Sequence, residues 1–175
     1  ATQAEQATYW GSSDTSDGGA LRFRTISEVS IRDCEVSYCA RGLRLQDCGS
    51  STNASIVANC KVFRTLEAAI YCAASSYTGT DGCRNMLITG NQIFEPANNG
   101  ILVIGGKDIT VQGNNVVRSA NAGIMQWHSL DSRIIGNSLF DCNRLNFNGV
   151  GSLGDAYGQI VIDGNTNIST TAGSH

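Results

Sequence analysis

Short stretches in which apolar residues alternate with polar ones recur along the chain, each four to five positions long. Alternation of this kind is typical of β-strands, whose successive side chains point to opposite faces. Gly, Asn, Asp and Ser lie between the stretches, as expected of turns, and apolar residues at helical spacing are hard to find. The pattern therefore predicts an all-β chain of short strands.

The stretches belong to two repeated signatures that run in phase. In the first, a Gly-Asn pair lies between apolar residues, as in residues 88–93, which read ITGNQI. The asparagine position, called the slot here, is occupied by Asn91, Asn114, Asn137 and Asn165, and by cysteine at Cys34 and Cys60. The second signature recurs at residues 20–23, 42–45, 69–72, 100–103 and 123–126. Successive slots are 26, 31, 23, 23 and 28 residues apart, and such periods indicate a solenoid.

This combination of signatures resembles the right-handed parallel β-helix of pectate-lyase-like enzymes, alginate epimerases and phage tailspikes. The resemblance covers residues 19–168 and implies an all-β solenoid of about six coils, in which strands of neighbouring coils pair in parallel. It says little about activity, because this architecture hosts several unrelated functions. The polar residues 1–18 are expected to form a short extended N-terminal arm or linker, and residues 169–175 a flexible tail.

The slot has a structural interpretation. Asparagines stacked at a tight corner can hydrogen-bond along the stack and to the backbone of the bend, and asparagine tolerates the left-handed conformation that such corners require. The glycine that precedes each asparagine supplies further conformational freedom. We therefore interpret the slot as a structural element that stabilises the corner, rather than as a ligand site.

Composition narrows the possible partners. The formal net charge is -3 and charged residues make up 15% of the chain, so no bulk electrostatic feature indicates a nucleic-acid partner. There is no apolar run of about 18 residues, and we expect no membrane span. Only two histidines occur and no Cys-x-x-Cys spacing, so we expect no metal and no cofactor.

Seven cysteines leave two pairs to consider. Cys48 and Cys83 follow strands of the second signature in neighbouring coils and are the best candidates for a disulfide. Cys34 and Cys60 occupy neighbouring slots, about 4.8 Å apart if their strands pair, which fits the lower part of the Cα range of a disulfide. Stacked free thiols are the alternative for this second pair, and the favoured one.

Candidate catalytic residues lie at strand entries. Asp108 and Asp131 both precede a slot by six residues, so they fall on consecutive coils at about the carboxylate spacing of a retaining glycosidase. Such aspartates also close turns through their own backbone, as the equivalent Asn85 would. His128, beside Trp127, could add an acid or base next to a sugar platform.

Two further sets of side chains are predicted to face outward. Arg22 and Arg44 form a small basic step suited to an acidic sugar or a partner carboxylate, but about 14 Å from the aspartate pair, too far for one reaction centre. An apolar strip favours a subunit contact and comprises Tyr71, Leu102, Ile104, Met125 and Trp127. A second apolar set could face outward or turn inward: Phe63, Phe94, Val117 and Phe140.

Two classes of function follow. The favoured class is a non-catalytic structural or adhesion module of a virion, such as a bacteriophage decoration, spike or tailspike-like protein, glycan-binding and oligomeric, with a trimer preferred. Its partners would be virion proteins or a cell-surface polysaccharide, and its location the virion or the extracellular space. The alternative is a lyase, hydrolase or epimerase acting on a bacterial or plant acidic glycan.

Overall fold

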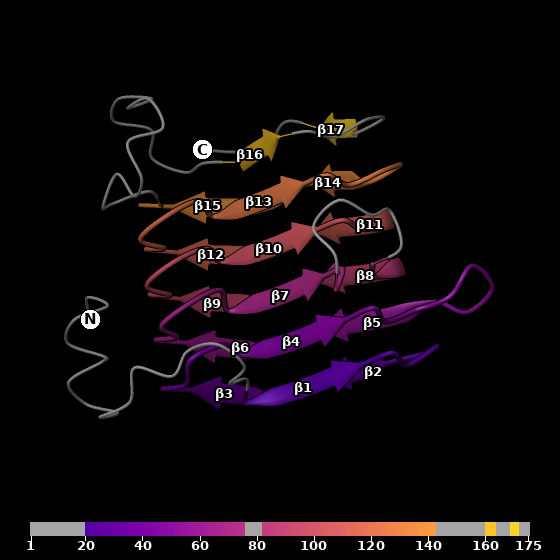
Figure 1. Ribbon diagram of the computed structural model, residues 1–175. Helices are drawn as coiled ribbons and strands as arrows, with labels where there is room; N and C mark the ends of the chain where they lie inside the picture. Colours follow the sequence, from indigo (N-terminus) through magenta and orange to yellow (C-terminus); the bar gives the residue numbers. More distant parts are fainter. Residues whose placement is uncertain (1–19, 76–81, 143–159, 164–168, 172–175) are drawn as a thin grey trace.

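The computed structural model describes residues 20–75, 82–142, 160–163 and 169–171. Within these ranges the chain forms strands and no helix, and the strands wind into a parallel β-solenoid (Figure 1). Each coil contributes one strand to each of three sheets, called sheets A, B and C. Five coils are complete in the described residues, and β16 and β17 belong to a sixth. The predicted all-β solenoid of about six coils is confirmed.

All described strand pairs are parallel and join neighbouring coils. Sheet A comprises β1 (Leu21–Arg24), β4 (Leu43–Gln46), β7 (Ile70–Ala73), β10 (Ile101–Ile104), β13 (Ile124–Trp127) and β16 (Ile160–Asp163). Sheet B comprises β2 (Ser30–Arg32), β5 (Ser55–Ala58), β8 (Arg84–Thr89), β11 (Lys107–Gln112), β14 (Arg133–Ile135) and β17 (Ser169–Thr171). Sheet C comprises β3 (Glu35–Ser37), β6 (Lys61–Phe63), β9 (Gln92–Phe94), β12 (Asn115–Val117) and β15 (Ser138–Phe140).

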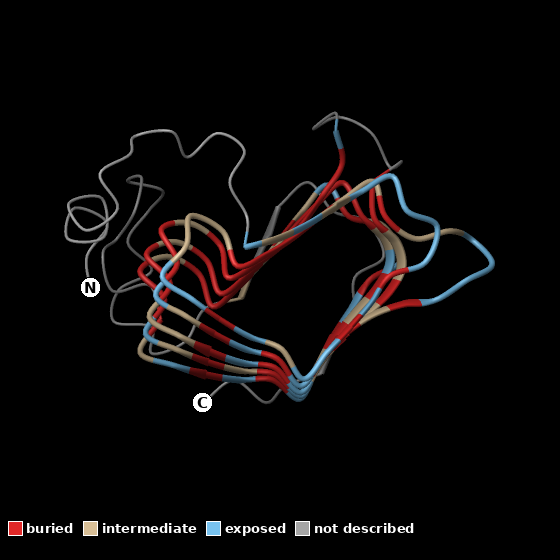
Figure 2. Cartoon of the chain, turned by 90° about the horizontal axis from the view of Figure 1, so that it is seen from below, coloured by how far each residue is buried: buried red, intermediate tan, exposed pale blue. Residues whose placement is uncertain are grey.

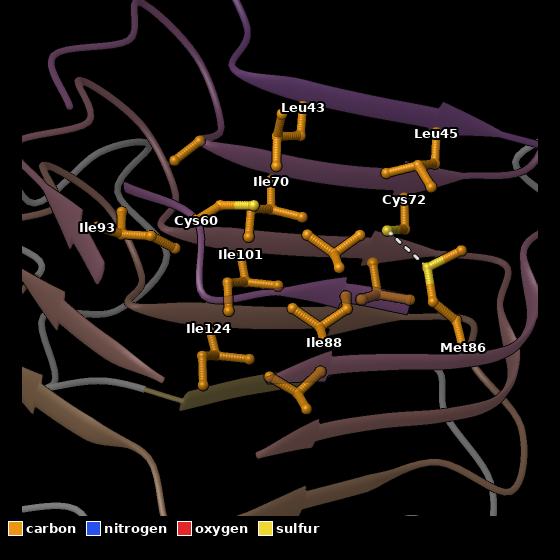
Figure 3. Packing of buried hydrophobic residues seen from close by; sticks show 14 of the residues in the cluster. Leu43, Leu45, Cys60, Ile70, Cys72, Met86, Ile88, Ile93, Ile101 and Ile124 are labelled. Atoms are coloured by element: carbon orange, nitrogen blue, oxygen red, sulfur yellow. Dashed lines mark hydrogen bonds between the residues drawn. The ribbon is translucent and has the colours of Figure 1, made fainter. Parts of the chain in front are cut away.

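The apolar residues of each strand point into the coil and stack on their counterparts. Seen along the stack, the coils superimpose around one buried interior (Figure 2). On sheet A, the residues Leu43, Ile70, Ile101 and Ile124 lie in register and form one fully buried column (Figure 3). Burying a side chain of this size contributes about 1.5–3 kcal/mol. Because every coil adds such residues, the stacked coils share one continuous core.

The first sequence signature spans the corner between sheets B and C. The slot asparagines are buried there and hydrogen-bonded to one another: Asn114 Oδ1 accepts from Asn91 N at 3.0 Å and from Asn91 Nδ2 at 2.9 Å, and Asn137 Oδ1 accepts from Asn114 N and Nδ2 at 2.9 Å. The backbone N of Cys60 donates to Asn91 Oδ1 at 2.9 Å and so extends this asparagine ladder to the cysteine slot. The predicted hydrogen bonding along the stack and to the bend is confirmed.

One detail of the predicted corner is wrong. The left-handed residue is not the slot residue but the one before it, at Asp33, Asn59, Gly90, Gly113 and Gly136. These five residues are exposed, whereas the slot side chains Asn91, Asn114 and Asn137 point inward. The physical reason is that the slot amide must face the interior to reach the neighbouring slot residues. The preceding residue therefore adopts the left-handed conformation that makes the bend.

The end of the solenoid extends beyond the predicted boundary. Strand β17 lies in the segment assigned to the flexible tail and pairs with β14. Threonine favours strands, and β14 offers unpaired backbone groups on that side. The predicted arm at 1–18 and the slot residue Asn165 lie outside the described residues. No helix long and apolar enough to cross a membrane occurs among the described residues.

Candidate functional site

The outer face of sheet C carries three rows of side chains that run across the coils. In each strand the middle residue is buried, so its neighbours face outward. Parallel pairing in register places equivalent residues on successive coils about 4.8 Å apart. The polar row is Glu35, Lys61, Gln92, Asn115 and Ser138; the phenylalanine row is Ser37, Phe63, Phe94, Val117 and Phe140; the charged row is Tyr38, Arg64, Glu95, Arg118 and Asp141.

The charged row lies at the bend that follows sheet C, and each of its residues has the left-handed conformation, with φ between 51° and 59°. The side chains form a chain of contacts. Arg64 donates through Nη1 to the Tyr38 hydroxyl at 2.6 Å and through Nε to Glu95 Oε2 at 3.1 Å. Arg118 Nη1 lies 3.3 Å from Glu95 Oε1, and Arg118 Nε lies 3.7 Å from Asp141 Oδ2. Opposite charges therefore alternate from coil to coil.

Glu95 is the central carboxylate of this row. The hydrogen bond from Arg64 lowers the pKa of Glu95, and Arg118 adds to the effect. The carboxylate is therefore ionised at neutral pH, and it is poorly suited to donate a proton as a general acid. Its role is to accept hydrogen bonds.

A cavity of about 370 Å³ opens between the phenylalanine row and the charged row. We call it the sheet C pocket, and its lining residues are Tyr38, Phe63, Arg64, Phe94, Glu95, Val117 and Arg118. Its volume falls within the range of about 300–1,000 Å³ that is usual for small-molecule sites. The lining combines apolar ring faces with guanidinium donors and a carboxylate acceptor, which is a surface suited to a polyhydroxylated ligand.

The sequence left open whether the phenylalanine row faces in or out, and the structure resolves it. Phe63, Phe94 and Val117 are half-buried on the outer face, and Phe140 is 58% exposed. The charged row was missed altogether. Its signal was present, because its five members follow the slot by four residues in every coil and their charges alternate from Arg64 to Asp141.

The predicted aspartate pair lies elsewhere, at the entry to sheet B. Asp108 and Asp131 are exposed and fall on successive coils, where Asp108 N donates to Leu130 O at 3.1 Å. Both have left-handed backbones, with φ of 54° and 49°, and Asn85 in the preceding coil has a φ of 46°. The shared conformation supports the alternative interpretation, in which these residues form the bend. Neither lines the sheet C pocket.

A comparison with protein families identifies the fold. The family described as right-handed β-helix region matches residues 8–139, which is most of the chain. The chain belongs to this right-handed β-helix family. No curated protein and no solved structure matches it. Membership confirms the predicted resemblance to right-handed β-helix proteins, but it specifies neither catalysis nor a place in a virion.

The other predicted binding residues of this β-helix are distributed over sheet A. Arg22 and Arg44 lie in register on β1 and β4, as the basic step requires. Arg22 is exposed, but Arg44 is buried, with its guanidinium carbon 5.7 Å from the centre of the Tyr71 ring. Three strands beyond β4, at the end of β13, the rings of Trp127 and His128 stack with centroids 5.3 Å apart. These residues do not converge on one site.

The predicted apolar strip is present on the outer face of sheet A as a small cluster. Tyr71 and Ile104 are buried in it at 7% and 5% exposure, beside the buried Ala68 and Ala73, whereas Leu102 and Trp127 are half-buried at its margin. Tyr71 and Ile104 are therefore packed within the chain. The half-buried members of the strip are Leu102, Met125 and Trp127.

The predicted disulfides are not formed, and all seven cysteines of the β-helix are free thiols. The thiols of each pair lie beside each other, and each also lies near a main-chain carbonyl: the Cys48 Sγ is 3.3 Å from Gln46 O and the Cys83 Sγ is 3.5 Å from Leu45 O. Cys34 and Cys60 fill neighbouring slots as thiols, which is the favoured alternative. The neighbouring Cys83 thiol and burial raise the pKa of Cys48, and burial raises that of Cys60. High pKa values disfavour the thiolate that disulfide formation requires.

No group of three or more His, Cys, Asp or Glu side chains suited to a metal ion occurs in the described ranges. Among the residues that the structure describes, the sheet C pocket is the best-defined candidate site, since it combines a cavity, ring faces and an organised set of charges.

Proposed function

We propose that this β-helix is a non-catalytic structural or adhesion module that binds a glycan on the outer face of sheet C. The observation that carries the proposal is the sheet C pocket, in which phenylalanine rings lie beside Arg64, Glu95 and Arg118. Sugar rings present apolar faces that pack on aromatic rings, and their hydroxyl groups hydrogen-bond to guanidinium and carboxylate groups. The one carboxylate of the lining is held ionised by arginine, which suits binding rather than acid catalysis.

We further propose that the module works outside the cell, on a virion or a cell surface, as a decoration, spike or tailspike-like element of a bacteriophage. Support comes from the family, whose fold is shared with tailspikes, and from the half-buried apolar residues on sheet A. A trimer through Leu102, Met125 and Trp127 is the assembly that we expect. Sedimentation should give an oligomer that Leu102→Glu and Trp127→Glu convert to monomers; a monomeric wild-type protein would refute the assembly.

Glycan binding is tested by affinity electrophoresis in gels that contain a single soluble polysaccharide. We expect retardation by at least one polysaccharide, and its loss in Phe94→Ala but not in Leu87→Ala, an apolar control on the outer face of sheet B. A parallel assay should detect no new reducing ends or unsaturated sugars. Retardation that is equal in the wild type and Phe94→Ala would exclude the sheet C pocket as the site.

The alternative function is a polysaccharide lyase, hydrolase or epimerase. The observation in its favour is the exposure of Asp108 and Asp131 on successive coils, at about one strand spacing. It predicts product release from an acidic glycan such as polygalacturonate or alginate, abolished by Asp108→Asn or Asp131→Asn. Activity that both variants retain in full would remove this pair from consideration.

A further inference from the structure

The outer face of sheet C repeats along the axis of the solenoid. Each of its three rows repeats once per coil, so contacts recur at about 4.8 Å along the axis of the solenoid. A linear chain laid along the axis meets equivalent groups at every step: a polar side chain on one flank, the phenylalanine row beneath, and the charged row on the other flank. A chain laid across the coils meets each row only once. The spacing is close to the length of one sugar unit in an extended glycan.

The same face is balanced in charge. The flanking rows carry three cationic side chains, Lys61, Arg64 and Arg118, and three anionic side chains, Glu35, Glu95 and Asp141. Glu35 and Lys61 lie opposite each other in register, and Glu95 contacts both arginines. A polyanion would therefore meet as much repulsion as attraction on this face.

Paired charges still offer hydrogen bonds. A guanidinium has five N–H donors, so Arg64 and Arg118 can donate to further oxygen atoms beyond their contacts with Glu95. Neutral hydroxyl groups accept such hydrogen bonds without bringing a charge to this face. A uronate would compete with Glu95 for the guanidinium groups and leave the displaced carboxylate without its partner.

We infer that this face takes a linear, uncharged glycan lying parallel to the solenoid axis, with about one sugar unit per coil. The inference rests on the proposed function, and it names the class of glycan and its orientation. Four positions of the phenylalanine row carry an apolar side chain, from Phe63 to Phe140, so the site accommodates about four units. Val117 replaces the ring at the third of these positions, which makes the contact weakest there.

The test compares neutral and anionic polymers on the intact protein. The neutral probes are soluble glucans, xylan, mannan and galactan; the anionic probes are polygalacturonate and alginate. Affinity electrophoresis at low and high salt shows whether the protein binds the neutral or the anionic polymers more tightly. Calorimetry with oligomers of increasing length, prepared from the tightest neutral polymer, gives the number of units bound.

We expect the neutral polymers to bind more tightly, with little dependence on salt, and affinity to rise with length up to about four units. Phe94→Ala and the more exposed Phe140→Ala should each weaken binding by about tenfold, as expected for the loss of one stacked ring, and Leu87→Ala, on the outer face of sheet B, should not. Binding only to the uronates, with a steep salt dependence, would overturn the inference and leave the proposed function standing. A plateau at two units would overturn the axial orientation. Failure of every polymer to bind would refute the proposed function as well.

Discussion

Replacing Asn114 by alanine removes five hydrogen bonds from the corner between sheets B and C. Asn91 Nδ2 keeps a second acceptor, the carbonyl of Val57, and Asn137 Oδ1 keeps the backbone donor of residue 114. The Asn91 backbone N–H loses its acceptor inside a corner where Asn91 is fully buried. A buried donor left unpaired costs about 1–3 kcal/mol, and the other four bonds contribute about 0.5–1.5 kcal/mol each. We expect the free energy of unfolding to fall by about 3 kcal/mol or more.

The measurement is urea denaturation of Asn114→Ala beside a matched control, Asn115→Ala. Asn115 is the next residue, is half-buried and faces outward in the polar row, so its loss should change the free energy of unfolding by about 0.5 kcal/mol or less. Hydrogen exchange should also show lost protection at the Asn91 N–H. Equal destabilisation by the two variants would refute the assignment of the asparagine ladder as a structural element.

Three further predictions concern the thiols, the charged row and the corners. At mildly alkaline pH the half-exposed Cys34 should react with a thiol reagent well before the four fully buried thiols, which are those of Cys48, Cys60, Cys72 and Cys83. All seven cysteines should react in denaturant, and early reaction of the four buried thiols in the folded protein would contradict the packing. Glu95→Gln should destabilise the protein by about 0.5–1 kcal/mol at neutral pH. Because Arg64 lowers the folded-state pKa of Glu95 from its ordinary 4.5, that difference should vanish as the pH falls through the lowered value, whereas a pH-independent difference would exclude the ion pair as its cause. Gly100→Ala places a Cβ 2.4 Å from a core valine and should lower the free energy of unfolding by about 3 kcal/mol in melting experiments. Gly113→Ala, where φ is +60° and nothing lies within 4 Å of the added Cβ, should lower it by about 1 kcal/mol, and the reverse order would contradict the described packing.

The interior of this β-helix could be predicted because its pattern is local and repeated. Each slot residue lies between strands only three or four residues long in most coils, so Asn91 and Asn114 could be aligned without knowing any distant contact. Parallel pairing then follows from the repeat, since the equivalent strands of successive coils stack in register although the insertions between them differ in length. The corner detail was harder, because asparagine and glycine both tolerate the left-handed conformation and their order does not say which one adopts it.

The outer surface was predicted less well, for a different reason. An outward apolar residue and an inward one look alike in sequence where a strand ends at a bend, so Phe63 and Phe94 stayed ambiguous until the burial of the intervening Val62 and Ile93 was known. The thiols of Cys48 and Cys83 posed the opposite difficulty. Their coils are neighbours, as predicted, and the two thiols lie side by side but unbonded, because residue spacing does not specify the oxidation state of a thiol pair.

Insertions lengthen the corner between sheets A and B, but not the corner between sheets B and C that precedes the candidate site. Between sheets B and C two residues separate the strands in all five complete coils, and the charged row follows the slot by four residues every time. Between sheets A and B the connection varies widely, from Gly105–Gly106 in one coil to residues 74–83 in another. Longer loops at a corner of a solenoid cost little free energy, so their lengths can vary. The constant two-residue connection between sheets B and C therefore needs a physical cause. Stacked asparagines require one spacing inside the corner, and this same spacing holds the phenylalanine and charged rows in register outside it. A surface that repeats so regularly is suited to a ligand that is itself a repeat, which is why we propose a linear glycan rather than a compact ligand for this face.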